Sequence, residues 1–262
     1  MNAQSRKIHN LVLIRYNMAP PTEWHNGTSY NLDNKWLERR HELFKRYCLP
    51  SLQRQRQEFI ALMYFDERTP VDYINSICSE HFIQPILTSQ HATTSEAMLE
   101  EVVRGIGAWT GKMQEIDALH AGDIVSTTRL DNDDAISPDY LQLANDAHLE
   151  SGCPDEEYVY FPTGQEFTVS DGNYYIRNHP NNAFGTLYER WKGHALRTVM
   201  HCQHSQLLKE HAHNSTPLEF GTPHWCMIIH ENNVSNRVRG KHAEQGYFPI
   251  QDHATNQTGD SP

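Results

Sequence analysis

The sequence predicts an α/β protein with a mixed, mainly parallel sheet flanked by helices, and an antiparallel portion in its second half. Up to residue 150, short apolar runs alternate with longer segments of helical periodicity, which is typical of a parallel sheet covered on both faces. Beyond Glu150, alternating polar and apolar residues rich in Tyr and Phe favour antiparallel hairpins. We therefore expect one domain with two halves, residues 1–150 and 151–250, and a flexible tail at 251–262.

Four buried strands are expected in the first half. Each is a short apolar run bounded by polar residues, and in order they are Asn10–Ile14, Phe59–Phe65, Phe82–Leu87 and Asp123–Thr128. Pro85 lies inside the third run. Because proline cannot donate a hydrogen bond to a neighbouring strand, this run suits an edge of the sheet.

The segments between these runs are predicted to be helices. Lys35–Gln57 is long and charged, but Pro50 should break or kink a helix there. Three further helices begin with a hydroxyl residue followed by proline or an acid, a capping pattern, at Thr69–Pro70, Thr93–Glu96 and Ser137–Asp139.

The second half is expected to mix hairpins with short helices. In order, we expect hairpins over Glu157–Ile176 with turn signals at Gly164 and Asp171–Gly172, a short helix over Phe184–Trp191, a His-rich helix over Ala195–His211 and a last strand over Trp225–Ile229.

Charge and hydropathy exclude some partners. The 262 residues carry a formal net charge of −11 at pH 7, which argues against a nucleic-acid partner and against attraction to anionic lipid by the chain as a whole. No apolar run approaches the roughly 18–20 residues that span a bilayer. The run Leu11–Ile14 is too short for a signal peptide, so we expect a cytoplasmic protein with reduced cysteines.

An acidic cluster directly follows the fourth predicted strand, as Asp131-Asn132-Asp133-Asp134. Ligands of such sheets bind at the carboxyl ends of the strands. Three adjacent carboxylates repel one another, and hard oxygen ligands suit Mn²⁺ or Mg²⁺. In an extended stretch Asp131 and Asp133 would point the same way and share one ion. The alternative is a solvated Asp-rich turn before the helix at Ser137.

Segment Thr128–Ser137, in a chain starting with a strand such as Leu11–Ile14, resembles the D-x-D motif of GT-A fold glycosyltransferases. More narrowly, the chain resembles a bacterial rhamnosyltransferase family, through Phe65–Pro70 and through Trp225-x4-His230-x-Asn232-Asn233-Val234-Ser235-Asn236-Arg237. The resemblance covers roughly residues 8–240. It implies a nucleotide-sugar-binding first half and an acceptor-side second half.

The activity that the resemblance implies is metal-dependent transfer of a sugar, rhamnose in this family. The donor would be a nucleotide-sugar, and the acceptor a hydroxyl group on a glycan or a lipid-linked precursor. A lipid-linked acceptor would require peripheral contact with the inner face of the membrane.

The resemblance also implies roles for individual residues. Arg15 and Asp66 would meet the nucleotide at the ends of the first two strands, with Asp66 accepting the N3–H of a uracil or thymine ring. Arg129 and Arg237 would bind the phosphates, since guanidinium groups bind phosphate bidentately. Each of these residues could instead be an ordinary strand-end, turn or surface residue.

The implied metal ligands are Asp131, which could instead meet the ribose, Asp133 and His230. Bound there, the metal would act as a Lewis acid on the leaving nucleoside diphosphate. His230, as one of 17 histidines, could also be a plain strand-end imidazole.

Inverting sugar transfer needs a base that takes the proton of the acceptor hydroxyl. The candidates are Glu166, Glu189 in the predicted short helix and Asp171 in a predicted turn. Glu189 could instead be a plain acid on the helix surface, and Asp171 a plain turn residue. A retaining mechanism would need no such base, and the residues leave both mechanisms open.

Three alternative interpretations remain. His201-Cys202-x-His204 with His211-x-His213 suggests zinc ligands, but the spacing matches no zinc motif. A magnesium-dependent nucleotidyltransferase would also use clustered carboxylates, yet no glycine-rich loop follows the first strand. A non-catalytic glycan-binding protein with a degenerate cleft is disfavoured by the intact Asp131 and Asp133 pair.

Overall fold

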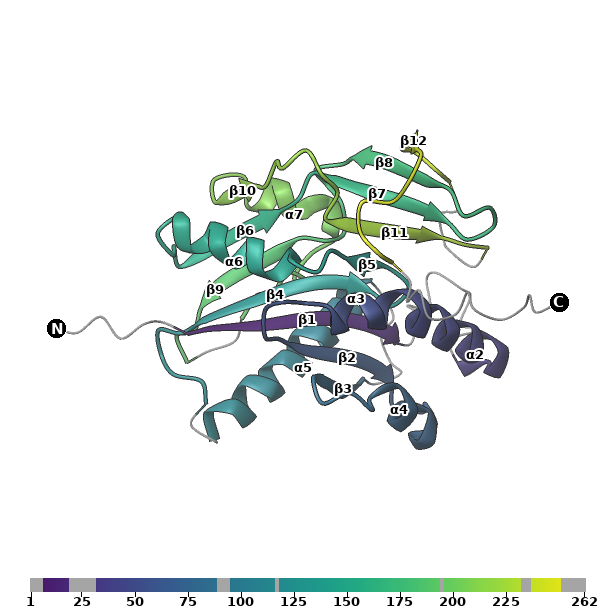
Figure 1. The fold of residues 1–262 in the computed structure, drawn as a ribbon. Helices are drawn as coiled ribbons and strands as arrows, with labels where there is room; N and C mark the ends of the chain where they lie inside the picture. The colour runs from purple at the N-terminus through teal and green to yellow at the C-terminus, as the bar shows by residue number, and fades with distance from the viewer. Residues whose placement is uncertain are drawn as a thin grey trace.

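The computed structural model describes residues 7–18, 32–88, 95–115, 118–193, 196–231 and 237–250. Its strands form two sheets, one of which lies above the other in Figure 1. The seven-stranded sheet has the order β10-β6-β9-β4-β1-β2-β3, and the five-stranded sheet has the order β12-β8-β7-β11-β5.

The centre of the seven-stranded sheet is parallel, as the sequence predicts. Its strands are β1 (Ile8–Asn17), β2 (Ile60–Asp66), β3 (Ile83–Thr88) and β4 (Ile124–Asp131). β1 pairs in parallel with β2 and with β4, and β2 pairs in parallel with β3. β3, which contains Pro85, lies at the edge of the sheet, so this prediction is confirmed.

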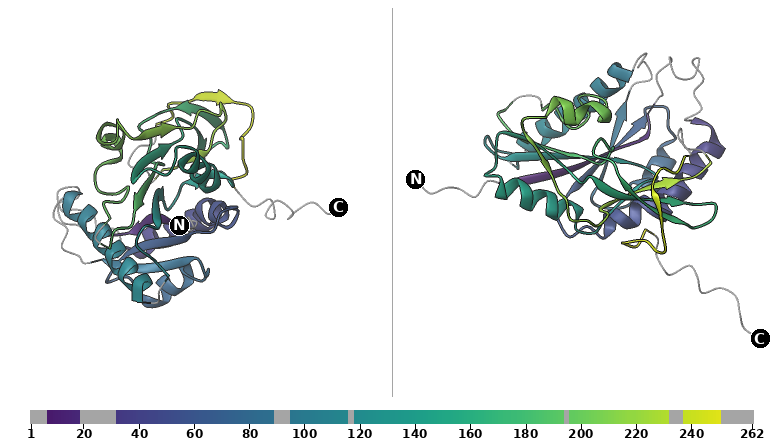
Figure 2. Two further views of the ribbon diagram at one scale, coloured as in Figure 1. Left: turned by 90° about the vertical axis from the view of Figure 1, so that its left-hand side faces the viewer. Right: turned by 90° about the horizontal axis from the view of Figure 1, so that it is seen from above.

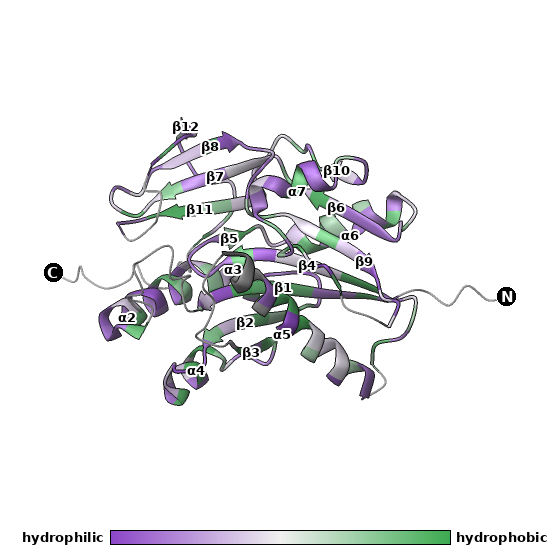
Figure 3. Cartoon of the chain, turned by 180° about the vertical axis from the view of Figure 1, so that it is seen from behind, coloured by the Kyte–Doolittle hydropathy of each residue, from purple (hydrophilic) through white to green (hydrophobic). Residues whose placement is uncertain are grey.

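Helices cover both faces of this sheet, as Figure 2 shows. One face packs against α3 (Leu49–Gln53), α4 (Val71–Ile77) and α6 (Tyr140–Glu150). The other face packs against α5 (Ser95–Glu115) and α7 (His204–Glu210). Apolar residues concentrate along β1 and β2 between these two layers (Figure 3), because both faces of those strands are buried.

The predicted helix over Lys35–Gln57 is divided into three parts. α2 (Asn34–Leu43) passes into a π-helical turn, η2 (Phe44–Cys48), and then into α3. Pro50 is the second residue of α3 and directly follows the π-helical turn, so the helix becomes irregular before the proline rather than ending there. η2 buries Phe44, Tyr47 and Cys48, so the irregular turn aims its side chains into the core.

The second half contributes strands to both sheets. β6 (Glu156–Tyr160), β9 (Thr186–Arg190) and β10 (Ser215–Pro217) extend the first sheet beyond β4. The second sheet contains β5 (Ala135–Ile136), β7 (Thr163–Thr168), β8 (Tyr174–Asn178), β11 (Trp225–Ile229) and β12 (Lys241–Ala243). The antiparallel β7–β8 hairpin and the strand Trp225–Ile229 were both expected from the sequence. The turn predicted at Gly164 is wrong, because Gly164 lies inside β7, and β6 and β7 belong to different sheets.

Two helix predictions in this half are wrong. The segment Phe184–Trp191 contains strand β9, which pairs antiparallel with both β4 and β6. Leu187 packs into the core on one face of the sheet and Tyr188 into the core on the other face. A strand that is buried on both faces is apolar without alternation, and a short run of this kind is indistinguishable from a buried helix by its periodicity. α7 occupies only the end of the segment predicted as a His-rich helix.

The chain crosses between the two sheets immediately after β4. β5 follows the acidic residues and pairs antiparallel with β11 in the second sheet (Figure 1). The acidic segment therefore lies at the junction of the two sheets. Among the described residues, no helix is long and apolar enough to cross a membrane.

Trp225 anchors the second sheet to the core. Its fully buried indole stacks on Phe184 at 4.9 Å between ring centroids, and Nε1 donates to the Phe161 carbonyl at 2.9 Å. Gly164 on β7 lies directly against this ring, and a Cβ at that position would overlap the indole.

We predict that Gly164→Ala lowers the free energy of unfolding by about 1–3 kcal/mol, because the fully buried indole has no space to move into. Gly107→Ala is the matched control, since a Cβ on this exposed α5 residue meets nothing within 4 Å. That control should gain about 0.5–1 kcal/mol from helix propensity. Urea denaturation measures both, and equal stabilities would contradict the packing argument.

Candidate functional site

The carboxyl ends of β1, β2 and β4 lie at one edge of the first sheet. Arg15 near the end of β1 is in register with Asp131 at the end of β4, and Asp66 ends β2. β11 of the second sheet ends just before His230, which contacts Asp133. The structure thus brings five of the predicted residues to one place: Arg15, Arg129, Asp131, Asp133 and His230.

Asp131 lies between two guanidinium groups. Its Oδ1 is 3.4 Å from Arg15 Nη2 and 3.6 Å from Arg129 Nη2. Burial alone would raise the pKa of Asp131, but the charges of Arg129 and Arg15 outweigh it and lower that pKa. Burial lowers the pKa of Arg129 to about 10, which leaves the group cationic at neutral pH. Within the described part of the chain, the buried Nε atoms of both arginines have no hydrogen-bond partner.

Asp133 faces away from Arg15 and Arg129 and pairs with a third arginine, Arg40. Its Oδ2 accepts a hydrogen bond from Arg40 Nη1 at 2.5 Å and lies 2.8 Å from His230 Nε2. Burial would raise the pKa of Asp133, but the bond to His230 and the charge of Arg40 lower it. Asp133 is therefore an ionised, buried carboxylate that is already paired.

Sequence reasoning missed Arg40, which lies on α2 far from the acidic segment in the chain. The same Nη1 atom also donates to Asn132 Oδ1 at 3.1 Å, and the guanidinium lies 5.2 Å from the Trp36 ring centroid. No local pattern marks Arg40 among its charged neighbours on α2, because its role depends on how that helix packs.

Asp134 has a structural contact. Its Oδ1 accepts the backbone N–H of Ile228 on β11 at 2.9 Å. Burial, followed by the charges of Asp133 and Asp131, raises the pKa of Asp134 well above its usual range. This carboxyl group ties the acidic segment to the second sheet.

Both geometric expectations for the acidic segment are wrong. The backbone turns after Asp131, with Asp134 N donating to Asp131 O at 3.1 Å, so the stretch is not extended. Asp131 and Asp133 consequently face different partners. A solvated turn is excluded as well, because the side chain of Asp133 is only 8% exposed, against 35% for Asp131.

These residues, as arranged, do not fit a divalent cation. Asp133 accepts two hydrogen bonds on one oxygen, and Asp131 shares one oxygen between two arginines. Over the described residues, no group of three His, Cys, Asp or Glu side chains could hold a metal ion. The Mn²⁺ or Mg²⁺ requirement predicted from the sequence stays a prediction.

Asp66 is fully buried and bonded to Arg68. Arg68 Nε donates to Oδ1 at 2.9 Å, and Nη2 donates to Oδ2 at 2.6 Å. The predicted contact with a nucleobase stays a prediction, and it would require Arg68 to move or to share the carboxylate.

Glu189 lies away from the acidic cluster. It is on β9, paired with Val125 near the amino end of β4, whereas Asp131 ends that strand. Its carboxylate accepts the backbone N–H groups of Arg197 and Thr198 at 2.7 and 2.8 Å. Because Thr198 has a φ of 66°, we interpret Glu189 as the anchor of a strained turn rather than as the predicted base.

Asp171 lies at the same edge of the second sheet as His230. It follows β7, whose last residue, Thr168, is in register with Ile229. The exposed carboxylate accepts hydrogen bonds from Thr168 Oγ1 and Asn173 N. Arg237 is exposed, and no hydrogen bond or ion pair among the described residues joins it to the cluster; the motif residues 232–236 lie outside those residues.

The His-rich segment is bound into local contacts. His201 and His211 meet edge to face at 5.2 Å, and His211 Nδ1 lies 3.2 Å from Glu156 Oε1. His204 instead lies 3.4 Å from Arg129 Nη1, next to Asp131. Over the described residues this segment assembles no zinc site.

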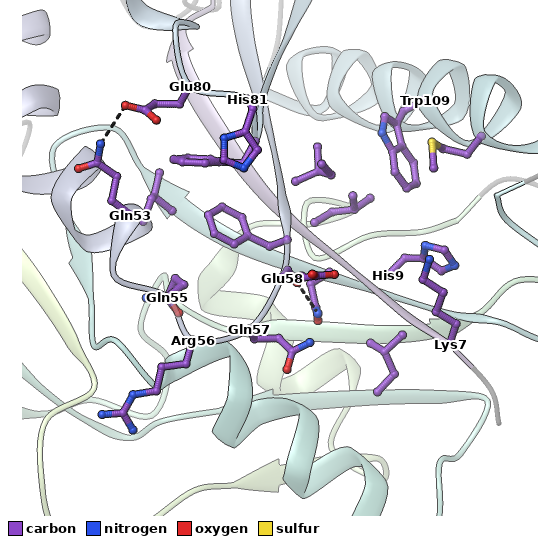
Figure 4. Close-up of a pocket in the computed structure, with 18 residues that line it drawn as sticks. Lys7, His9, Gln53, Gln55, Arg56, Gln57, Glu58, Glu80, His81 and Trp109 are labelled. Carbon is purple, nitrogen blue, oxygen red and sulfur yellow. Dashed lines mark hydrogen bonds between the residues drawn. The ribbon is translucent and has the colours of Figure 1, made fainter. Parts of the chain in front are cut away.

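A separate cavity of about 660 Å³ opens at the amino ends of β1 and β2 (Figure 4). Trp109, Phe59 and His9 line it, and Gln53 Nε2 donates to Glu80 at 2.9 Å on its rim. This cavity lies at the opposite edge of the sheet from Asp131 and contains none of the residues that the sequence predicted for the site.

The mixed sheet with a parallel centre and helices on both faces is the α/β fold that the sequence predicts. The profile of a family described as "Putative rhamnosyl transferase" matches residues 18–242. The chain therefore belongs to this family of glycosyltransferases. No curated protein sequence matches it.

Similar solved structures include S. aureus TarS. TarS 1–349 in complex with UDP-GlcNAc has a TM-score of 0.46 and 10% identity, covering 87% of this chain and 60% of that one. TarS 1–349 without a named ligand has a TM-score of 0.42 and 10% identity, covering 85% and 60%. The chain thus spans about 60% of the TarS fragment that it matches.

We predict that His204→Gln makes stability less dependent on pH. Burial and the charges of Arg129 and Arg15 lower the pKa of His204 to about 4, so the folded state keeps this imidazole neutral. The unfolded chain protonates it below about pH 6.5, so the wild type loses stability as the pH falls from about 6.5 towards 4.

Urea denaturation at several pH values between about 7 and 5 measures the difference. The exposed His213→Gln variant is the control and should follow the wild-type profile. Parallel profiles for wild type and His204→Gln would contradict the prediction.

Proposed function

We propose that this protein transfers a sugar, with rhamnose as the first candidate, from a nucleoside-diphosphate sugar to a hydroxyl group on a glycan or lipid-linked precursor. The observation that carries the proposal is the pair of arginines, Arg15 and Arg129, beside Asp131 at the carboxyl ends of β1 and β4. The chain's membership of a glycosyltransferase family supports the same reaction class.

The arginine pair is suited to a diphosphate. Guanidinium groups bind phosphate oxygens bidentately, and both arginines have a buried Nε without a partner among the described residues. Charge develops on the leaving diphosphate as the sugar departs. Fixed cations in a partly buried site stabilise that charge more than water does.

The proposed reaction is a single inverting displacement. The acceptor oxygen attacks the anomeric carbon, and the carboxylate of Asp171 takes the hydroxyl proton. The bond from the anomeric carbon to the diphosphate oxygen breaks, and its electron pair leaves with the nucleoside diphosphate. Asp171 is the candidate base because it is exposed at the edge of the second sheet where His230 also lies.

The compartment forms part of the proposal. Nucleotide-sugars would reach the site from the cytoplasm, and a lipid-linked acceptor would be met at the inner face of the membrane. The net charge of −11 means that such contact would rest on a local docking patch rather than on the whole surface.

We predict that one of dTDP, UDP, GDP and CDP raises the melting temperature, tested with and without Mn²⁺. Ligand at about one hundred times its Kd stabilises the native state by about 2.7 kcal/mol through mass action. Arg129→Met should abolish the shift, and Lys112→Met, on the exposed surface of α5, should leave it unchanged. No shift with any nucleotide under either condition would refute the proposed function.

We predict that Asp171→Asn lowers kcat by about one hundredfold or more with little change in the KM for the donor, because the acceptor proton loses its base. Release of nucleoside diphosphate in the presence of an oligosaccharide acceptor measures this rate. Asp146→Asn, an exposed acid on α6, is the control. A variant that keeps more than half of kcat would eliminate Asp171 as the base, and NMR of the product anomer distinguishes inversion from retention.

A further inference from the structure

We propose that this site binds the donor diphosphate without a resident divalent cation, with Arg40 held on Asp133 where a metal would bind and Arg15 and Arg129 contacting the phosphates. The inference rests on the proposed function and concerns the same edge of the sheet. It follows from three features of the described residues.

The first feature is that the two predicted metal ligands are bonded to each other. His230 Nε2 lies 2.8 Å from Asp133 Oδ2 in a buried contact. An ionised carboxylate can only accept, so Nε2 must carry the proton of this hydrogen bond. Nε2 with its proton has no lone pair to offer a metal, and Asp133 Oδ2 already accepts hydrogen bonds from His230 and Arg40, so the two facing atoms are not available to a shared ion in this arrangement.

The second feature is that contacts with neighbouring residues fix the position of the Arg40 side chain. Its side chain is 17% exposed, and one nitrogen serves both Asp133 Oδ2 and Asn132 Oδ1. α2 begins at a side-chain cap, where Asp33 accepts the N–H of Trp36 at 3.0 Å, and Trp36 in turn packs against the Arg40 guanidinium. Arg40 is therefore held on Asp133 from a fixed helix.

The third feature is a surplus cation on the other side of the turn. Arg15 and Arg129 both face one oxygen of Asp131, so two guanidinium groups meet a single carboxylate. Arg129 is only 7% exposed, and its Nε has no partner within the described residues. A buried guanidinium with an unsatisfied N–H group destabilises the folded state unless it binds an anion, and a diphosphate is such an anion.

Together these features place cationic side chains where a metal-dependent site places an ion between carboxylates and phosphates. Arg40 neutralises Asp133, and one arginine of the pair neutralises Asp131. The pair of arginines therefore keeps one positive charge in excess of Asp131, and a diphosphate that contacts both arginines meets a positive site without an added ion.

Isothermal titration with UDP, dTDP, GDP and CDP, each in EDTA and in Mn²⁺, tests the inference. We expect the nucleotide that binds to have Kd values in the two buffers that agree within about threefold, well below the tenfold that corresponds to about 1.4 kcal/mol. A Kd at least tenfold weaker in EDTA would overturn the inference and leave the proposed function standing. No binding in either buffer would refute the proposed function, and the inference with it.

Arg40→Met separates the role of Arg40 from a general cation effect. Removing the guanidinium leaves the charge of Asp133 without a cation and His230 as its remaining partner, so we expect Mn²⁺ to take the place of Arg40 and nucleotide binding to become dependent on Mn²⁺. We also expect Mn²⁺ without nucleotide to bind, which is read as loss of the free-ion signal in electron paramagnetic resonance.

Arg39→Met, the preceding residue on α2, is the matched control, because Arg39 is partly exposed and faces Glu42 at 3.0 Å and Glu231 at 4.0 Å instead of Asp133. It should resemble the wild type in both measurements. Arg40→Lys restores a cation and should return binding in EDTA, which separates a lost charge from a misfolded variant. Two results would overturn the inference. One is that the wild type binds Mn²⁺ stoichiometrically in the absence of nucleotide. The other is that Arg40→Met still binds nucleotide equally well in EDTA and in Mn²⁺.

Discussion

Three neighbouring carboxyl groups sit at the junction of two sheets, and their mutual repulsion has to be neutralised for the chain to pass there. Asp131 meets Arg15 and Arg129, Asp133 meets Arg40, and Asp134 accepts the N–H of Ile228. These contacts join β1, β4, α2 and β11 around one turn. Leaving a single member of such a network unpaired costs more than the pair contributes, so the partners depend on one another.

The same turn gives the site two different sides. Arg15, Arg129 and Asp131 alternate with core residues on the face that α5 and α7 cover, where His204 lies beside Arg129. Asp133 faces α2, where it pairs with Arg40. Because the backbone turns after Asp131, one side is left with surplus positive charge and the other is internally balanced. This division, rather than the number of acids, decides what the site can bind.

The sequence was informative where local chemistry dominates. The apolar runs identified the four strands at the parallel centre of the first sheet, β1 to β4. Pro85 identified the edge strand, because a missing N–H has the same consequence in any context. The capping residues before α4 and α6 also predicted helices that the structure contains. β9 was mistaken for a helix, since its pairing with β4 and β6 involves residues far apart in the chain. Glu189 was therefore expected on a helix, whereas it lies on β9.

The sequence by itself determined the α/β class, the parallel centre of the sheet, and the location of Arg15, Arg129 and Asp131 at its carboxyl-end edge. Strand periodicity is enough for this, because adjacent parallel strands end at the same edge. Only the tertiary structure decided what faces the acids. Arg40 reaches Asp133 because α2 packs beside the turn, and His230 arrives from the second sheet. Electrostatic pairing depends on distances in space, and a linear pattern of charges does not contain them.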